Sequence, residues 1–163
     1  FSIVVVLALT MSMPPMIGGM LGAGELEKIR KLVRIAVRFI LGWQLFIGLV
    51  WLGASGVVST LFSPDADVQD TLLSYLLRVP LSYSGLGVCI LMVSVNNALG
   101  MPMRALLIST LRLFACYLPL LWIGGQVSGL TGLMTGALIG NLLAGAMAYS
   151  LYRQGMNRLR RPA

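Results

Sequence analysis

The sequence predicts an all-α polytopic membrane protein whose helices cross a lipid bilayer repeatedly. Of its 163 residues, 58% are hydrophobic and only 10% are charged, and the mean hydropathy is +0.90. A soluble domain carries about a quarter charged residues, so this chain has too little polar surface to cover itself in water. Its apolar runs lack the alternation of period two that a transmembrane β-barrel requires. Helices in lipid therefore remain as the fold class.

Five apolar segments are long enough to cross the hydrocarbon core, which takes about 20 helical residues. Backbone groups in lipid must bond within their own segment, so each of these segments is expected to be a helix. The expected helices cover about 1–23, 35–62, 71–99, 103–125 and 129–152. The chain begins inside an apolar run, without an initiator Met or a signal peptide, and we expect a C-terminal piece of a longer protein.

The charges of the connecting segments alternate along the chain. The stretch "GELEKIRKLVR" is basic, "SPDADVQD" is acidic, the corner at Arg104 is basic, "GGQVSG" is uncharged, and 153–163 is basic. The positive-inside rule then predicts a multi-pass membrane protein with a cytoplasmic C-terminus and 153–163 as a basic cytoplasmic tail. The net charge of +7 lies at segment ends, which favours anionic lipid as a partner and argues against nucleic acid.

The basic stretch before the second span has two interpretations. Arg30, Arg34 and Arg38 recur every fourth residue and share one helical face. They fit an interfacial helix that binds anionic lipid. They also fit a simple cytoplasmic extension of the second span that obeys the topology rule.

The first span contains a pair of prolines at its centre. Pro14 and Pro15 each lack a backbone donor, and four glycines follow them, at 18, 19, 22 and 24. This pattern predicts a helix break that acts as a bending point or lines a pocket, as broken helices do in transporters. The alternative is a kink that a neighbouring helix repairs.

Polar and small residues form a stripe along the third span. The members recur at intervals of three or four residues, with one step of seven, and are Thr71, Ser74, Arg78, Ser82, Gly85, Cys89 and Asn96. At about 100° per residue they share one helical face, which should meet protein or water and not lipid.

Arg78 and, on the fourth span, Arg112 are expected about 12 Å inside the membrane surfaces. An arginine at that depth needs a cavity or polar partners, unless it snorkels along a tilted helix. We predict Arg78, Ser82, Asn96 and Arg112 as cavity or gate residues.

Acidic residues and histidines are absent from all five predicted spans. A carboxylate site for a coupling cation therefore cannot lie wholly in this chain, and no metal site or resident cofactor is expected. Enzymatic acid–base chemistry also lacks its usual groups. Cys89 and Cys116 fall within apolar runs and are expected as buried thiols, not as a disulfide.

The fifth span carries small residues at every fourth position: Gly132, Gly136, Gly140, Ala144 and Ala148. Such a row lets another helix approach closely. Asn141 lies next to this row and is expected to form a hydrogen bond across the helix contact.

The order of these motifs resembles the multidrug and toxic compound extrusion (MATE) transporters. "GGMLGAGELEKIRKLVRIAVRF" resembles the turn and basic helix start that follow helix eight of that family. "YLLRVPLSY" and "VNNALGMPMRALLISTLRLF", with "YLPL" beyond, resemble helices ten and eleven with their NALG-x-P-x-R hairpin. "GLTGLMTGALIGNLLAGAMAY" is similar to helix twelve. The resemblance covers essentially the whole chain.

The resemblance implies five helices, eight to twelve, of one six-helix lobe in a two-lobe transporter. That transporter would export drug-like cations or other amphipathic molecules in exchange for H⁺ or Na⁺ by alternating access, with the N-terminal lobe of the same protein as partner. The acids that bind the coupling cation in the family have no counterpart in this chain. Two other hypotheses remain open: a lipid-linked oligosaccharide flippase of related architecture, and a membrane packing module or truncation that transports nothing.

Overall fold

The structure, a computed structural model, is built from long helices. It describes the backbone of residues 2–62 and 66–159 and the side chains of 3–54, 78 and 81–159. The elements are α1 (Ser2–Gly22), α2 (Leu26–Phe62), α3 (Ala66–Ala98), α4 (Pro102–Thr110), the π-helix η1 (Leu111–Tyr117) and α5 (Leu118–Leu159). No strand occurs within these described ranges, and the prediction of an all-α fold is confirmed.

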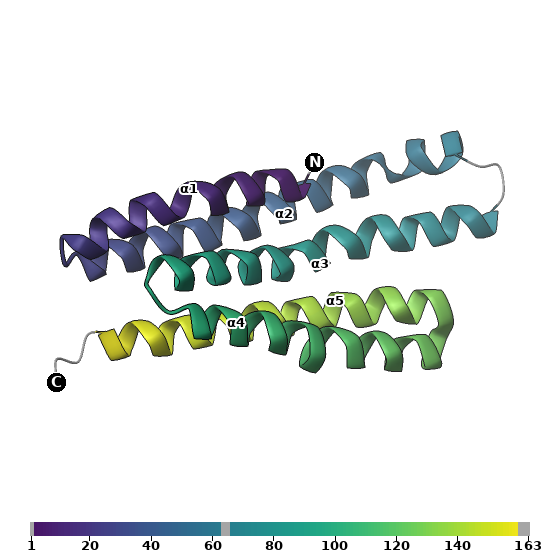
Figure 1. The fold of residues 1–163 in the computed structure, drawn as a ribbon. Helices are drawn as coiled ribbons and strands as arrows, with labels where there is room; N and C mark the ends of the chain where they lie inside the picture. Colours follow the sequence, from purple (N-terminus) through teal and green to yellow (C-terminus); the bar gives the residue numbers. More distant parts are fainter. Residues whose placement is uncertain (1, 63–65, 160–163) are drawn as a thin grey trace.

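The last element contains a reversal that divides it into two antiparallel legs. Ser128 has φ −144° and ψ 26°, and Gly129 has φ 55° and ψ −130°, so neither is helical. A positive φ is available to glycine at little cost, and the chain turns back on itself there (Figure 1). Accordingly α4, η1 and 118–127 form one rod, which is the predicted fourth helix. Residues 130–159 form the fifth.

The helices are long and apolar enough to cross a membrane. Among the described residues, such segments are Ile3–Gly22, Leu26–Ala54, Leu81–Ala98 and Pro102–Leu159, the last of which includes the reversal at Gly129. Large apolar side chains remain exposed on their outer faces; Trp122, for example, is 70% exposed. Exposure of such an apolar surface to water is unfavourable, whereas contact with lipid is not. The multi-pass membrane architecture is thus confirmed.

Two glycine turns lie at the same end of the molecule. Gly24 and Gly100 both have φ 72°, and each ends a helix with the paired backbone hydrogen bonds of a Schellman motif. Pro102 then starts α4, where a missing N–H does no harm. Both turns lie on the side of the molecule that holds the C-terminal end of α5, and the turn at Gly129 lies on the opposite side (Figure 1). This arrangement matches the alternation of sides predicted from the loop charges.

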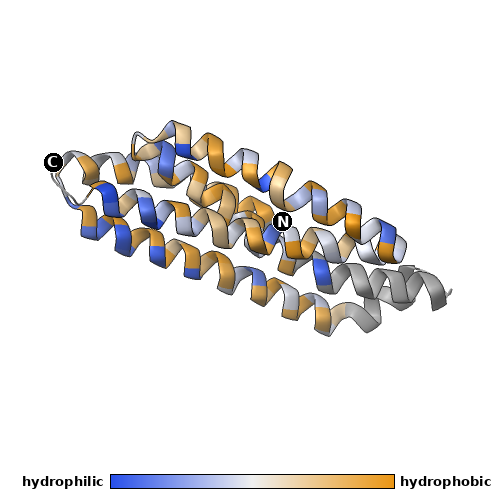
Figure 2. Ribbon diagram, turned by 90° about the horizontal axis from the view of Figure 1, so that it is seen from below, coloured by the Kyte–Doolittle hydropathy of each residue, from blue (hydrophilic) through white to orange (hydrophobic). Residues whose placement is uncertain are grey.

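The helices extend further than their apolar cores. α2 begins at Leu26, well before the predicted 35, and α5 continues to Leu159, so that 153–159 of the predicted tail are helical. Hydropathy detects only the part of a helix that lies in lipid, whereas charged residues prolong the helix into the headgroup region. At 1.5 Å per residue α2 is about 55 Å long, more than the hydrocarbon thickness of about 30 Å. Hydrophilic residues gather at the end of the molecule where α2 begins and α5 ends (Figure 2). Residues 160–163 lie outside the described part.

The helix α3 lies between two layers. It packs against α1 and α2 on one side and against α4, η1 and α5 on the other (Figure 1). Because α3 is covered on both sides, it contributes many of the fully buried side chains of the core, among them Leu91, Met92 and Val95.

Glycines allow the second leg of α5 to approach its neighbours closely. A Cβ atom at Gly136 would collide with the carbonyl oxygen of Leu120 in the first leg, and one at Gly140 would lie 2.9 Å from that of Cys116. Toward α3, a Cβ at Gly145 would lie 2.8 Å from the carbonyl oxygen of Gly85. The close packing predicted from the small-residue row is confirmed.

The predicted helix break at Pro14 and Pro15 is not present in α1, which is helical from Ser2 to Gly22. Pro14 cannot donate to the carbonyl of Thr10 four residues earlier. The Ser94 hydroxyl of α3 donates to that oxygen instead, at 2.9 Å. The neighbouring helix thus supplies the donor that the proline lacks.

The role of Ser94 can be tested by a single substitution. We expect Ser94→Ala to lower the free energy of unfolding by about 1–2 kcal/mol, because it leaves the Thr10 carbonyl unpaired. Thermal unfolding of the full-length protein in detergent measures this. The control is Ser109→Ala, since that hydroxyl bonds only Ala105 of its own helix, at 3.1 Å. Equal losses in both variants would show that Ser94 has no special role.

Candidate functional site

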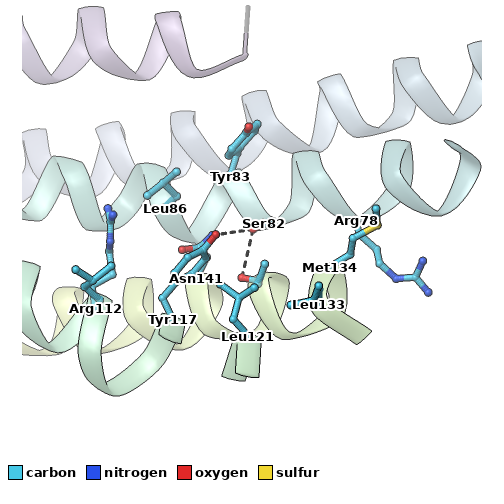
Figure 3. A pocket seen from close by; sticks show the side chains of 12 residues that line it. Arg78, Ser82, Tyr83, Leu86, Arg112, Tyr117, Leu121, Leu133, Met134 and Asn141 are labelled. Atoms are coloured by element: carbon cyan, nitrogen blue, oxygen red, sulfur yellow. Dashed lines mark hydrogen bonds between the residues drawn. The ribbon is translucent and has the colours of Figure 1, made fainter. Parts of the chain in front are cut away.

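A pocket opens between α3, η1 and both legs of α5. Its volume is about 400 Å³. It brings together three of the four residues predicted from sequence as cavity residues, Arg78, Ser82 and Arg112. The other lining residues are Tyr83, Leu86, Leu113, Tyr117, Leu121, Leu133, Met134, Ala137 and Asn141. Figure 3 shows this pocket from close by.

A short chain of hydrogen bonds joins α3 to α5 beside the pocket. The side-chain amide of Asn141 donates to the Ser82 hydroxyl at 2.8 Å, and that hydroxyl donates to the Ala137 carbonyl at 3.4 Å. Both polar side chains are buried, with 6% and 7% of their surface exposed. The hydrogen bond across the contact that Asn141 was predicted to make is confirmed. Because the Ser82 hydroxyl both donates and accepts within the protein, its main effect is to fix the two helices.

Two arginines mark opposite ends of the pocket. Arg78 extends from α3 beside Met134, and its guanidinium points away from the Ser82–Asn141 pair (Figure 3). Arg112 extends from η1 at the other end, half-buried, with the Cys89 thiol of α3 beside it. Among the described residues that line the pocket, Arg78 and Arg112 carry charge, and both are positive. The described wall of the pocket therefore presents positive charge.

Aromatic and apolar side chains cover the rest of the wall. Tyr83 and Tyr117 combine an apolar ring with a hydroxyl, and leucines and Met134 supply the apolar surface. A pocket that is mostly apolar with a few placed polar groups is typical of small-molecule binding. This arrangement can hold an amphipathic organic molecule with its apolar body on the rings and a negative or hydrogen-bonding group on an arginine.

The π-helix positions part of this wall. Arg112, Leu113 and Tyr117 all belong to η1, whose turns are wider than those of an α-helix. π-helical turns occur frequently at functional sites. Nothing in the stretch "LRLFACY" distinguishes it from an α-helical segment, so sequence reasoning found Arg112 but neither the π-helix nor Tyr117.

Asn96, the fourth predicted site residue, lies away from the pocket. It is fully buried, with 0% of its surface exposed. Its amide donates to the Met92 carbonyl at 2.7 Å, and its backbone carbonyl accepts from the Met101 N–H at 2.9 Å. Asn96 thus belongs to the turn that ends α3. Pro14 and Pro15 do not line the pocket either, and Thr71 and Ser74 lie outside the described side chains.

Long apolar helices packed around a partly polar pocket define a class, the polytopic membrane proteins. Within that class the family is also clear. Residues 1–123 match the MatE family model, and the chain belongs to the MATE family of membrane transporters.

The relatives agree with this assignment. A protein of Shewanella oneidensis named FAD transporter is 34% identical over 149 residues, which cover 91% of this chain and 33% of the relative. The Vibrio cholerae MATE transporter VcmN, in its bent form, is 50% identical with a TM-score of 0.88; the match covers 97% of this chain and 36% of VcmN. An outward-facing multidrug resistance MATE family transporter shares the fold, with a TM-score of 0.85 at 18% identity, over 99% of this chain and 37% of its own. The chain thus spans about a third of the length of these relatives.

Proposed function

We propose that this chain is part of a secondary active transporter that exports amphipathic organic molecules in exchange for H⁺ or Na⁺. The observation that carries the proposal is the pocket between α3, η1 and α5, which combines tyrosines and leucines with Arg78 and Arg112. Membership of the MATE family supports transport as the activity. In this proposal the protein lies in a bacterial inner membrane with its C-terminus in the cytoplasm, in line with the basic residues at that end.

The proposed mechanism is alternating access between two lobes. The helices of this chain would form one wall of the transport path, and an N-terminal lobe of the same protein would form the other. Tight glycine contacts between α3 and α5 favour movement of this wall as a rigid body. The coupling cation would bind to acids outside this chain, because none lies in its spans.

The charge of the pocket bears on the cargo. Drug-like cations are the cargo that the family resemblance implies, but two arginines in one pocket disfavour a cation. A cargo that carries phosphate or carboxylate would pair with them. The Shewanella oneidensis relative is named FAD transporter. Export of a flavin nucleotide or a similar anionic aromatic molecule is therefore a second candidate function.

The proposal is tested by Arg78→Ala in the full-length protein. We expect efflux of the cargo to fall by roughly tenfold, because a charged hydrogen bond contributes about 1.5–3 kcal/mol. Membrane insertion should stay intact. Efflux of ethidium and release of FAD, measured in cells that express each variant, would separate a cationic from an anionic cargo.

The matched control for this test is Arg158→Ala, which removes an exposed arginine near the end of α5, away from the pocket. Unchanged resistance to toxic cations and unchanged FAD release in the Arg78 variant would refute the assignment of the pocket.

A further inference from the structure

A second pocket lies between α2 and the end of α5, at the end of the molecule that carries the basic residues. Its volume is about 320 Å³. Three arginines line it: Arg30 and Arg34 come from α2, and Arg153 comes from α5. The other described lining residues are Tyr149, Tyr152, Met156 and Asn157, and none of the described lining residues is acidic.

Part of this pocket is fixed by internal contacts. The Arg30 guanidinium donates to Asn157 Oδ1 at 2.8 Å, which joins α2 to α5. Glu27 approaches the same guanidinium at 3.6 Å, so one of the three positive charges has a partner. Converging arginines from segments more than a hundred residues apart repel one another, and an anion between them would remove that repulsion.

A buried hydroxyl at the same place lacks a hydrogen-bond partner. Tyr152 is 3% exposed, and its hydroxyl forms no hydrogen bond with any described residue. Such a group costs free energy unless a ligand or water satisfies it. A phosphate oxygen held by the arginines could accept a hydrogen bond from it. The unsatisfied hydroxyl is thus a second, independent indication of a ligand here.

An apolar pocket continues from this site along the same helices. Its volume is about 470 Å³, and it shares Arg34 and Tyr149 with the cationic pocket. Arg38 also lines it near that junction. The glycines of the α3–α5 contact, Gly85 and Gly145, lie along it, and its apolar wall consists of Val37, Leu41, Val88, Leu142 and Ala146. A cationic pocket that opens into an apolar groove matches a molecule with an anionic head and a hydrocarbon chain.

We propose that the cleft between α2 and α5 holds one anionic phospholipid, with its phosphate bound by Arg30, Arg34 and Arg153 and an acyl chain in the adjoining groove. Arginine guanidinium groups bind phosphate oxygens in bidentate fashion. Tyrosines such as Tyr149 and Tyr152 are typical of the membrane interface, where phosphates lie. This lipid is a structural ligand and does not depend on the proposed export function.

The test is native mass spectrometry of the full-length protein released from detergent micelles. The probes are dioleoyl phosphatidylglycerol, dioleoyl phosphatidylcholine, glycerol phosphate and inorganic phosphate. We expect one phosphatidylglycerol to remain bound, and at least tenfold weaker retention of the zwitterionic lipid. Glycerol phosphate and inorganic phosphate should not displace the bound lipid at equal concentration. Displacement by either would indicate a site for soluble phosphate and overturn the proposal.

Three variants localise the lipid. Arg30→Gln/Arg153→Gln should reduce phosphatidylglycerol retention by about tenfold, whereas the control Lys31→Gln/Arg158→Gln removes two exposed charges from the same end and should leave it unchanged. Tyr152→Phe preserves the shape of the core and should weaken retention by about threefold. Ala146→Trp fills the groove and should abolish retention of the long-chain lipid.

Two further results would overturn the assignment. One is an equal loss in the arginine variant and its charge-matched control, which would indicate a diffuse attraction. The other is the absence of any retained lipid in the folded full-length protein, as expected if another part of the transporter covers the cleft. An unchanged melting temperature in Tyr152→Phe keeps the test valid if the double variant folds poorly.

Discussion

Replacing Gly85 by valine is expected to disrupt the packing of α3 against α5 and to lower the free energy of unfolding by about 3 kcal/mol. A Cβ at this position would collide with the backbone carbonyl of Asn141, and no rotamer change can move a backbone atom out of the way. The two helices must therefore separate. Separation would also break the Asn141–Ser82 hydrogen bond of 2.8 Å and open the wall of the pocket.

The measurement is thermal unfolding of the full-length protein in detergent, together with the yield of monodisperse protein. Gly42→Val is the matched control, because a Cβ at Gly42 meets nothing within 4 Å. That control should retain yield and melting temperature. A Gly85 variant as stable as the Gly42 variant would mean that the helices are not packed as closely as described.

Replacing Arg112 by glutamine is expected to reverse the cargo preference of the pocket. Loss of one of two positive charges should reduce transport of an anionic aromatic cargo by about tenfold or more, since a hydrogen bond to a charged group contributes about 1.5–3 kcal/mol. Transport of a cation should stay equal or rise, because a like charge has been removed from its path. Arg112 is half-buried in η1, so the change is made inside the pocket.

Parallel uptake assays in vesicles, one with FAD and one with ethidium, measure the change in transport of the anionic and of the cationic cargo. Lys31→Gln serves as the control, because it removes one exposed positive charge from α2 without touching this pocket. If both cargoes lose transport equally in the Arg112 variant, the arginine supports the structure of the wall and does not select charge.

The fold was predictable because two simple rules act on every segment. Apolar runs must be helical in lipid, and the alternation of charged loops orders their ends. Gly24 and Gly100 mark two of the turns, and both have the positive φ that favours glycine there. The helix ends were less predictable, since hydropathy cannot follow α2 back to Leu26 or α5 on to Leu159 through charged residues.

The site was predictable only in part. Ser82, Arg78 and Arg112 reach the pocket because polar groups in an apolar helix must face protein or a cavity. Asn96 shares their helical face but lies at the end of α3, where it serves the turn. Periodicity gives the direction of a side chain but not its neighbours. The same limit explains the wrong prediction of a break at Pro14: the Ser94 hydroxyl that bonds the Thr10 carbonyl is 84 residues away in the chain, so local sequence does not reveal it.

The reversal at Gly129 has a consequence for how the chain enters the membrane during synthesis. In the proposed orientation the connecting stretch "GGQVSG" crosses the bilayer, and because it carries no charge its transfer requires no ion to leave water. The two legs on either side are already in contact through Gly124, Gly132 and Gly136. The last two helices can therefore leave the translocon as a prepaired hairpin, and a lysine placed at Gln126 should slow that step.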